Sequence, residues 1–422
     1  MRKKKIGFVA IILVLLISMA GCTSSDDTSS SAQNNEMLSS SGSENIEADT
    51  IDSADDFTYS VSSLGSDEKY IVINGLKKNN PTNRSIVKVP ESIDGMPVRV
   101  IGESAFEGYD NILSVTLPAS LYKIDKEAFS GCKLLSGIII PKQVTNIDTL
   151  AFYGCQSLTD VKIEAESLFN VSSDAFDDTP LYDSSKTGPY YIDSIFYKYN
   201  FGTSEEDIVS EMEKLSKDGF EIKDGTKTIA YMAMGYPANS LEDIASLPKI
   251  DIFVPDSVTF MGPWSFYELN IGKFDTSVNF LKYDPSGFIY GSYVDVLDFR
   301  GDLNEEDMIT VHSMDSIITD KLVVPMCECF FGFDVKAKTI ILSDGTHGLD
   351  LSLNYESESD VVLEKIYIPG TVENIVSDEI ITCGGKEFCD FTIYTQSGSL
   401  AEEYAKKHKI NCVIVKDSSE VT

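Results

Sequence analysis

The chain has 422 residues, of which 42% are hydrophobic, and a formal net charge of −33 at pH 7. A surface this acidic repels phosphate backbones, which excludes nucleic acid as a direct partner, and it also argues against docking on anionic lipid. The sequence contains three histidines and one tryptophan, so the side chains that most often serve in catalysis are scarce.

Residues 1–21 are predicted to be an export signal. Basic residues at 2–5 precede an apolar run from Ile6 to Ile17, which is too short to span a membrane comfortably. The small residues directly before Cys22 resemble the lipobox of bacterial lipoproteins. This resemblance implies that Cys22 becomes a lipidated first residue and that acyl chains anchor the protein at the outer face of a membrane. The alternative is an ordinary cleaved signal.

Residues 22–56 are predicted to be a disordered tether, because they are rich in serine and acidic residues and contain no lysine or arginine. Residues 57–97 are predicted to form an N-terminal cap with strands at 70–73 and 86–89. Pro90 ends the second strand because it offers no ladder donor. Residues 93–97 exceed the regular spacing that follows, and predict a turn that widens the first coil.

One phrase is spelled four times between residues 98 and 180: an aliphatic residue, three variable positions and then an Ala-Phe pair. Its phenylalanines recur at steps of 23, 23 and 24 residues, at Phe106, Phe129, Phe152 and Phe176. Other apolar positions keep the same register. A fixed period in this range indicates a stacked solenoid rather than a domain with a single core.

Each regular repeat is predicted to contribute one short strand to a parallel ladder. Ile138 and Ile140 lie two residues apart and so share one face of an extended segment that Pro141 ends. The Ala-Phe pair is predicted to lie in a compact turn that packs the ring on that face. Cys132 and Cys155 occupy the same repeat position, which indicates either buried free thiols or a disulfide between adjacent coils.

These letters, I-G-x-x-A-F-x-G-C followed by L-x-x-V-x-I-P, closely resemble the bacterial surface leucine-rich repeats of the BspA type. The resemblance implies a curved leucine-rich repeat solenoid that is displayed outside the cell and used for binding. The expected fold class of the chain is an α/β-type repeat stack.

Residues 181–222 are predicted to be an insertion. Tyr190 to Tyr199 has the pattern of a hairpin, and its tyrosines indicate packing or, alternatively, a recognition patch. Thr203 to Gly219 has the pattern of an amphipathic helix whose apolar face is Ile208, Met212 and Leu215.

Residues 223–385 are predicted to be degenerate repeats, with the Ala-Phe slot at 233–234 and 265–266; between 270 and 322 the pattern gives no clear register. Residues 386–422 are predicted to be a C-terminal cap. Ser399 to Glu402 has the pattern of a capping box that opens a helix, and a final strand is expected at 410–415.

No constellation of reactive side chains stands out. Cys327 and Cys329 lack a second ligand pair at a spacing typical of zinc sites, so neither a metal nor another cofactor is expected. The sequence does not decide whether Cys383, Cys389 and Cys412 form disulfides. Phosphate loops, serine elbows and zinc-protease motifs are absent from the sequence. We therefore expect a binding protein rather than an enzyme, and an active site within 270–365 is the third hypothesis.

The predicted binding face consists of the residues that flank the buried positions of three successive strands: Ser114, Thr116, Gly137, Ile139, Asp160 and Lys162. The leading hypothesis is a lipid-anchored monomer that binds a protein on a host or neighbouring cell. The alternative is a subunit that captures carbohydrate or serves as a scaffold at the cell envelope. If these six residues bind no partner, they are ordinary solvent-exposed strand residues.

Overall fold

The structure is a computed structural model. It describes residues 50–64, 68–77, 85–235, 244–277, 288–290, 292–303, 318–324, 326–327, 336–350, 354–355, 363–376, 382–383, 386–387 and 391–421. The predicted export signal, Cys22 and most of the predicted tether lie outside these residues, as do Cys329 and Cys389. For Cys327 and Cys383 the backbone alone is described.

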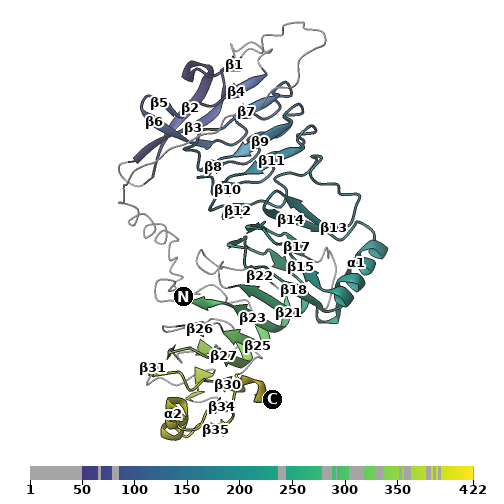
Figure 1. Cartoon of the computed structure of the whole chain (residues 1–422). Coiled ribbons are helices and arrows are strands. Elements are labelled where there is room, and N and C mark those ends of the chain that lie inside the picture. Colours follow the sequence, from purple (N-terminus) through teal and green to yellow (C-terminus); the bar gives the residue numbers. More distant parts are fainter. Residues whose placement is uncertain are drawn as a thin grey trace, which may run out of the picture. The chain divides into compact units, whose positions relative to one another are not determined.

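On one side of the regular repeats, each coil contributes a short strand, and these strands lie side by side (Figure 1). Strand β4 (Ile86–Lys88) pairs with β7 (Ser114–Thr116), and β9 (Gly137–Ile140) pairs with β11 (Asp160–Ile163). Gly137 lies opposite Asp160, as the 23-residue period predicts. Ile86 lies opposite Ser114, a longer step, because the antiparallel pair β5 (Ser92–Ile93) and β6 (Met96–Ile101) occupies the extra residues.

A second parallel ladder corrects the prediction of one strand per coil. Strand β6 pairs with β8 (Lys123–Ile124), β8 with β10 (Asn146–Ile147), and β10 with β12 (Asn170–Val171). Stacking places each repeat position beside the same position of the next coil. Two extended residues in one coil therefore pair with the two equivalent residues of the next. The aliphatic residue of the repeated phrase is therefore a strand residue as well as a core residue.

The phenylalanines form a single column, as predicted. Neighbouring rings from Phe106 to Phe176 are stacked, with centroids 5.2, 5.3 and 5.1 Å apart. The N–H of Phe106 donates to the Ala128 carbonyl of the next coil at 2.8 Å, and Phe129 and Phe152 repeat this bond at the same length. Ring stacking and backbone bonding thus join the same turns.

Cys132 and Cys155 lie beside this column as buried free thiols, and the disulfide alternative is wrong. Each sulfur donates to the carbonyl of the phenylalanine one coil earlier, at 3.2 Å. Burial raises the pKa of the Cys132 thiol, and raises the pKa of Cys155 to about 12. Both therefore act as small apolar residues near neutral pH. Cys412, near the C-terminus, is also a free thiol.

Ordered structure begins inside the range 22–56 that the sequence assigns to the tether. Strand β1 (Thr50–Ile51) pairs with β4, and Ile51 is buried because it extends the core by one coil. The short helix η1 (Ala54–Asp56) follows with a capping box from Ser53. Strands β2 (Phe57–Leu64) and β3 (Glu68–Leu76) are antiparallel, and β3 continues the ladder to β6.

The predicted hairpin and helix are confirmed. Strands β13 (Gly188–Ile192) and β14 (Ile195–Asn200) are antiparallel, and helix α1 (Glu205–Asp218) begins at the cap Ser204 and ends at Gly219. The Tyr197 hydroxyl accepts the N–H of Phe176 at 3.0 Å, where earlier coils use an alanine carbonyl. Tyr197 and Tyr199 are buried, which supports packing for these two tyrosines.

The degenerate repeats keep the predicted register. Ile229 pairs with Met261, and Met234 pairs with Phe266. After Pro118, Pro141, Pro255 and Pro369, the residue three positions later donates its N–H to the proline carbonyl at 3.0–3.2 Å; these donors are Leu121, Val144, Val258 and Val372. The regular and the degenerate coils therefore contain the same type of turn.

A long parallel sheet covers the range where the sequence gives no register and continues past 385. Its strands are, in order, β15 (Phe220–Glu221), β18 (Ile250–Phe253), β21 (Asn270–Ser277), β23 (Tyr293–Arg300), β25 (Ile318–Val324), β27 (Lys336–Leu342), β30 (Lys365–Tyr367), β34 (Thr392–Thr395) and β35 (Asn411–Ile414). The predicted C-terminal cap thus contributes two strands to the stack.

Short strands and turns complete the coils. They are β16 (Thr228–Ile229), β17 (Met234–Gly235), η2 (Ile244–Ser246), β19 (Phe260–Met261), β20 (Phe266–Tyr267), β22 (Ile289–Tyr290), β24 (Asp302–Leu303), β26 (Met326–Cys327), β28 (Gly348–Asp350), β29 (Asn354–Tyr355), β31 (Asn374–Val376), β32 (Thr382–Cys383), β33 (Lys386–Glu387) and η5 (Ser418–Glu420).

Helix α2 (Leu400–His408) follows β34. Ser399 accepts the Glu402 N–H at 3.1 Å, as in the predicted capping box, but the Glu402 carboxylate accepts the N–H of Gly398 instead of Ser399. Within the part of the chain that the structure describes, no helix is long and apolar enough to cross a membrane.

Replacing Phe129 with alanine should destabilise the protein by about 3–5 kcal/mol, because it opens a cavity between two stacked rings. Denaturant unfolding measures this cost. Tyr153→Ala is the matched control, since Tyr153 is a neighbouring aromatic residue that is 42% exposed. An equal loss of unfolding free energy in the two variants would contradict a special contribution of the stacked phenylalanine rings to stability.

Candidate binding face

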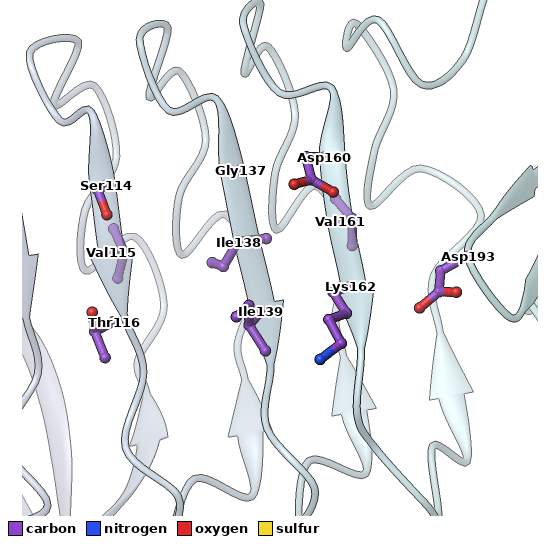
Figure 2. Close-up of a pocket in the computed structure, with 10 residues that line it drawn as sticks. All are labelled: Ser114, Val115, Thr116, Gly137, Ile138, Ile139, Asp160, Val161, Lys162 and Asp193. Carbon is purple, nitrogen blue, oxygen red and sulfur yellow. The ribbon is translucent and has the colours of Figure 1, made fainter. Parts of the chain in front are cut away.

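The six residues of the predicted binding face lie together on the outward side of β7, β9 and β11 (Figure 2). Val115, Ile138 and Val161 alternate with them and are buried. One row across the strands is Ser114, Gly137 and Asp160, and the next row is Thr116, Ile139 and Lys162. Together they line an open hollow of about 580 Å³.

Two residues of β9 shape the middle of this hollow. Gly137 has no side chain, and a Cβ atom there would lie 3.2 Å from the Asp160 carbonyl oxygen, so glycine suits the close approach of β11. Ile139 is 53% exposed. An exposed isoleucine beside a bare backbone gives a partner both apolar and polar contacts.

Asp193 lines the hollow and was missed by the sequence reasoning. It lies in the turn between β13 and β14, with a positive φ of 49° that aspartate tolerates better than most residues. Its carboxylate accepts the N–H of Ile163 at 2.6 Å. The hairpin therefore satisfies a backbone donor on the outer strand β11. The Ile192-Asp193-Ser194-Ile195 stretch was the available signal, since a polar pair between apolar residues indicates a tight turn.

The hollow is negatively charged overall. Asp160 and Asp193 both line it, and the one cation, Lys162, is paired with Glu164. The hydrogen bond from Lys162 to Glu164 is the main cause that raises the pKa of this lysine. The lysine stays protonated, and its charge is offset by the glutamate.

The parallel ladder is interrupted beneath the hollow. Strand β7 pairs with β4 and β9 pairs with β11, but no ladder joins β7 to β9, although residues 85–235 are described without a gap. Figure 2 shows the two strands side by side, with the residues that line the hollow drawn as sticks.

The described residues hold no group of three or more histidine, cysteine, aspartate or glutamate side chains that could bind a metal ion. The described parts of 270–365 are mainly strands of the long sheet. The Cys327 and Cys329 side chains lie outside the described residues.

Residues 85–231 match the family model described as the BspA type leucine rich repeat region, in six copies. The matched range begins at β4 and extends through the β13–β14 hairpin and α1 to the worn coil at Tyr231. No curated protein matches the chain.

Three solved structures are similar to this chain. The pneumococcal vaccine antigen PcpA is 12% identical, with 87% of this chain and 98% of that chain covered and a TM-score of 0.25. A leucine rich cell surface protein from Faecalibacterium prausnitzii is 18% identical (76% and 66% covered, TM-score 0.23). A leucine-rich repeat protein from Bacteroides ovatus is 13% identical (86% and 99% covered, TM-score 0.21).

Replacing Asp193 with alanine should cost about 1–2 kcal/mol, because Ile163 loses its acceptor and a residue at positive φ loses a tolerant side chain. Urea unfolding and the exchange rate of the Ile163 amide measure the effect. Asp193→Asn keeps an acceptor oxygen and should remain close to the wild type; a loss as large as that of Asp193→Ala would show that the charge, not the hydrogen bond, matters.

Proposed function

Because residues 85–231 match BspA-type leucine-rich repeats, we propose that the protein is a non-catalytic, lipid-anchored surface protein that binds another protein through the outward face of β7, β9 and β11. The observation that supports this most is the hollow, in which three successive coils present unshielded strand residues beside an exposed isoleucine.

The geometry favours recognition over chemistry. The face is built on strands that are fixed by the core beneath them, so it presents a rigid surface with little ordering cost. The hollow is shallow and open, and its carboxylates, hydroxyls and lysine form no nucleophile–base pair. A broad protein surface fits it better than a small substrate that must be enclosed.

Charge narrows the class of partner. The chain carries a formal charge of −33, and the hollow itself contains more carboxylates than unpaired cations. A basic protein surface is attracted over a longer distance than an acidic one, and this attraction speeds association at low salt. The partner is therefore a basic protein of a host or neighbouring cell, and the chain acts as a monomer.

The N-terminal region supplies the anchor in this proposal. Lipidation of Cys22 after export would attach the chain to the outer face of a membrane. A flexible segment of the length between Cys22 and β1 reaches on the order of 30 Å, which moves the first coil away from the lipid headgroups. Carbohydrate capture or a scaffold role at the envelope is the alternative.

Replacing Ser114, Thr116, Asp160 and Lys162 together should reduce capture of the partner at least about tenfold, since all four side chains line the hollow. Affinity capture from mixed cells, followed by partner identification and titration, measures this. The matched control replaces Glu107, Asp110, Lys133 and Gln156, which are exposed on the same coils outside the hollow. Unchanged capture by the first variant would place the site elsewhere, and binding only on a glycan array would favour the carbohydrate alternative.

Replacing Cys22 with serine should release the protein into the medium or leave an unprocessed precursor, because no thiol remains for acylation. Membrane fractionation and mass spectrometry of the N-terminus distinguish the two forms. If the Cys22→Ser protein fractionates with the membrane at its normal processed mass, the lipid anchor is wrong.

A further inference from the structure

Strand β35 is the last strand of the long sheet. It pairs in parallel with β34 on one side, and no strand within the described part of the chain pairs with it on the other. Figure 1 shows β35 beside β34 and α2 near the C-terminus. The side chains of Val413 and Ile414 are 42% and 48% exposed. An open sheet edge with exposed apolar side chains is a template for pairing with another strand.

One hydrogen bond identifies the backbone groups at this open edge. The N–H of Val415 donates to the Thr395 carbonyl of β34 at 2.9 Å. Successive residues of a strand direct their N–H and C=O to opposite neighbours, so those of Val413 also face β34. The N–H and C=O of Cys412 and Ile414 therefore face away from the sheet.

The chain closes both ends of this edge itself. Before β35, the N–H of Ile410 donates to the Ala405 carbonyl at 2.9 Å. After β35, the N–H of Lys416 donates to the Glu420 carboxylate at 3.2 Å. The open part is therefore no longer than the four residues of β35. An edge this short favours a short pairing over the addition of a long strand.

A second copy of the same edge complements these groups. When two copies of β35 pair antiparallel about a two-fold axis at Val413, Cys412 of each copy lies opposite Ile414 of the other. Each such pair exchanges both of its N–H···O bonds, and the two Val413 side chains form the closely spaced pair between them. The outward backbone groups of the strand and its exposed apolar side chains all gain partners.

Charge supports the same orientation. The chain carries a formal charge of −33, so two copies repel each other, but residues 400–422 contain four lysines and four acidic residues. Lys409 precedes β35 and Asp417 follows it, and both are exposed. Antiparallel pairing places the start of one strand beside the end of the other, which brings Lys409 toward Asp417 of the second copy. The edge is therefore locally neutral and its charges complement each other across the axis.

We propose that β35 is a self-association edge, at which two copies of this chain join antiparallel so that the long sheet continues from one copy into the other. The pairing is weak, because a four-residue edge buries far less surface than a stable dimer requires. The chain in dilute solution therefore remains a monomer, and copies concentrated on one surface pair. This inference goes beyond the proposed function and concerns a different surface from the face of β7, β9 and β11.

Disulfide trapping tests the two-fold axis. In the full mature chain carrying Cys412→Ser, the further change Val413→Cys places two thiols opposite each other at a Cα separation of about 4.5 Å, which a disulfide can span. Mild oxidation of concentrated protein should link them at least about tenfold faster than the thiols of Asn411→Cys in the same background, since Asn411 lies opposite Val415 and not its own copy.

Non-reducing electrophoresis and mass spectrometry identify the linked residues, and Cys412→Ser alone gives the background from the other cysteines. Equal rates for the Val413→Cys and Asn411→Cys proteins would overturn the axis at Val413. Oxidation on whole cells that links the introduced thiol to a different protein, and not to a second copy, would overturn self-association.

Sedimentation velocity over a concentration series measures pairing without a cross-link. The mean sedimentation coefficient of the wild type should rise with concentration. Val413→Lys should weaken association at least about tenfold, because two like charges then face each other at the axis. Val209→Lys is the matched control, since Val209 is 47% exposed on helix α1. Association of the Val413→Lys protein at the wild-type level would contradict the proposal, as would a wild type that neither associates nor is trapped.

A charge exchange tests the orientation. Lys409→Glu and Asp417→Lys should each weaken association about three- to tenfold, because each change turns two attractive contacts of the dimer into repulsive ones. The double variant should recover the wild-type association. Asp417 also accepts the Ser419 N–H at 2.9 Å, so recovery in the double variant separates charge pairing from the loss of that contact. A double variant as weak as the weaker single variant would rule out the antiparallel orientation.

Discussion

The hydrogen bond from a phenylalanine N–H in one coil to an alanine carbonyl in the next sets the spacing on which the rest of the stack depends. It recurs at 2.8 Å in three successive coils, and the rings beside it stack at 5.1–5.3 Å. Because this contact requires a small residue followed by a large ring, the Ala-Phe pair is the most constant part of the sequence. Coils held at one strand spacing bring equivalent extended segments side by side, and the ladders form between them except between β7 and β9.

The same repetition accounts for the position of the predicted binding face. A core that fixes Val115, Ile138 and Val161 leaves the residues between them outward in every coil, and their identity is then free to vary. The repetition is broken at this face. Here β7 and β9 remain unpaired above two intact connections, and Asp193 from an inserted hairpin borders the hollow.

The sequence predicted those features that repeat or depend on neighbours in the chain. The phenylalanine column, the register at Met234 and Phe266 and the helix between Thr203 and Gly219 are of this kind. The second ladder was missed because two extended residues carry no signal of their own until a copy lies beside them. Asp193 was missed because it reaches Ile163 across 30 residues, a separation that breaks the period. The interruption has no sequence signal, since β7 and β9 keep the regular step.

The C-terminal half shows the same limit. Strand β21 pairs with β23 at the regular step, Asn270 opposite Tyr293, yet the apolar pattern there gave no register because the phenylalanine slot is not repeated in its usual form. Strands β34 and β35 extend the sheet past the predicted end: β34 pairs with β30 and has two buried positions, and β35 pairs with β34.

Site-specific photo-cross-linking from the strand face tests the central claim most directly. A photoreactive side chain placed at Thr116 should cross-link to the captured partner, while one placed at Glu107, on the turn of the same coil, should not. Adducts from Glu107 in the absence of adducts from Thr116 would contradict the assignment of the outward strand face as the surface that meets the partner.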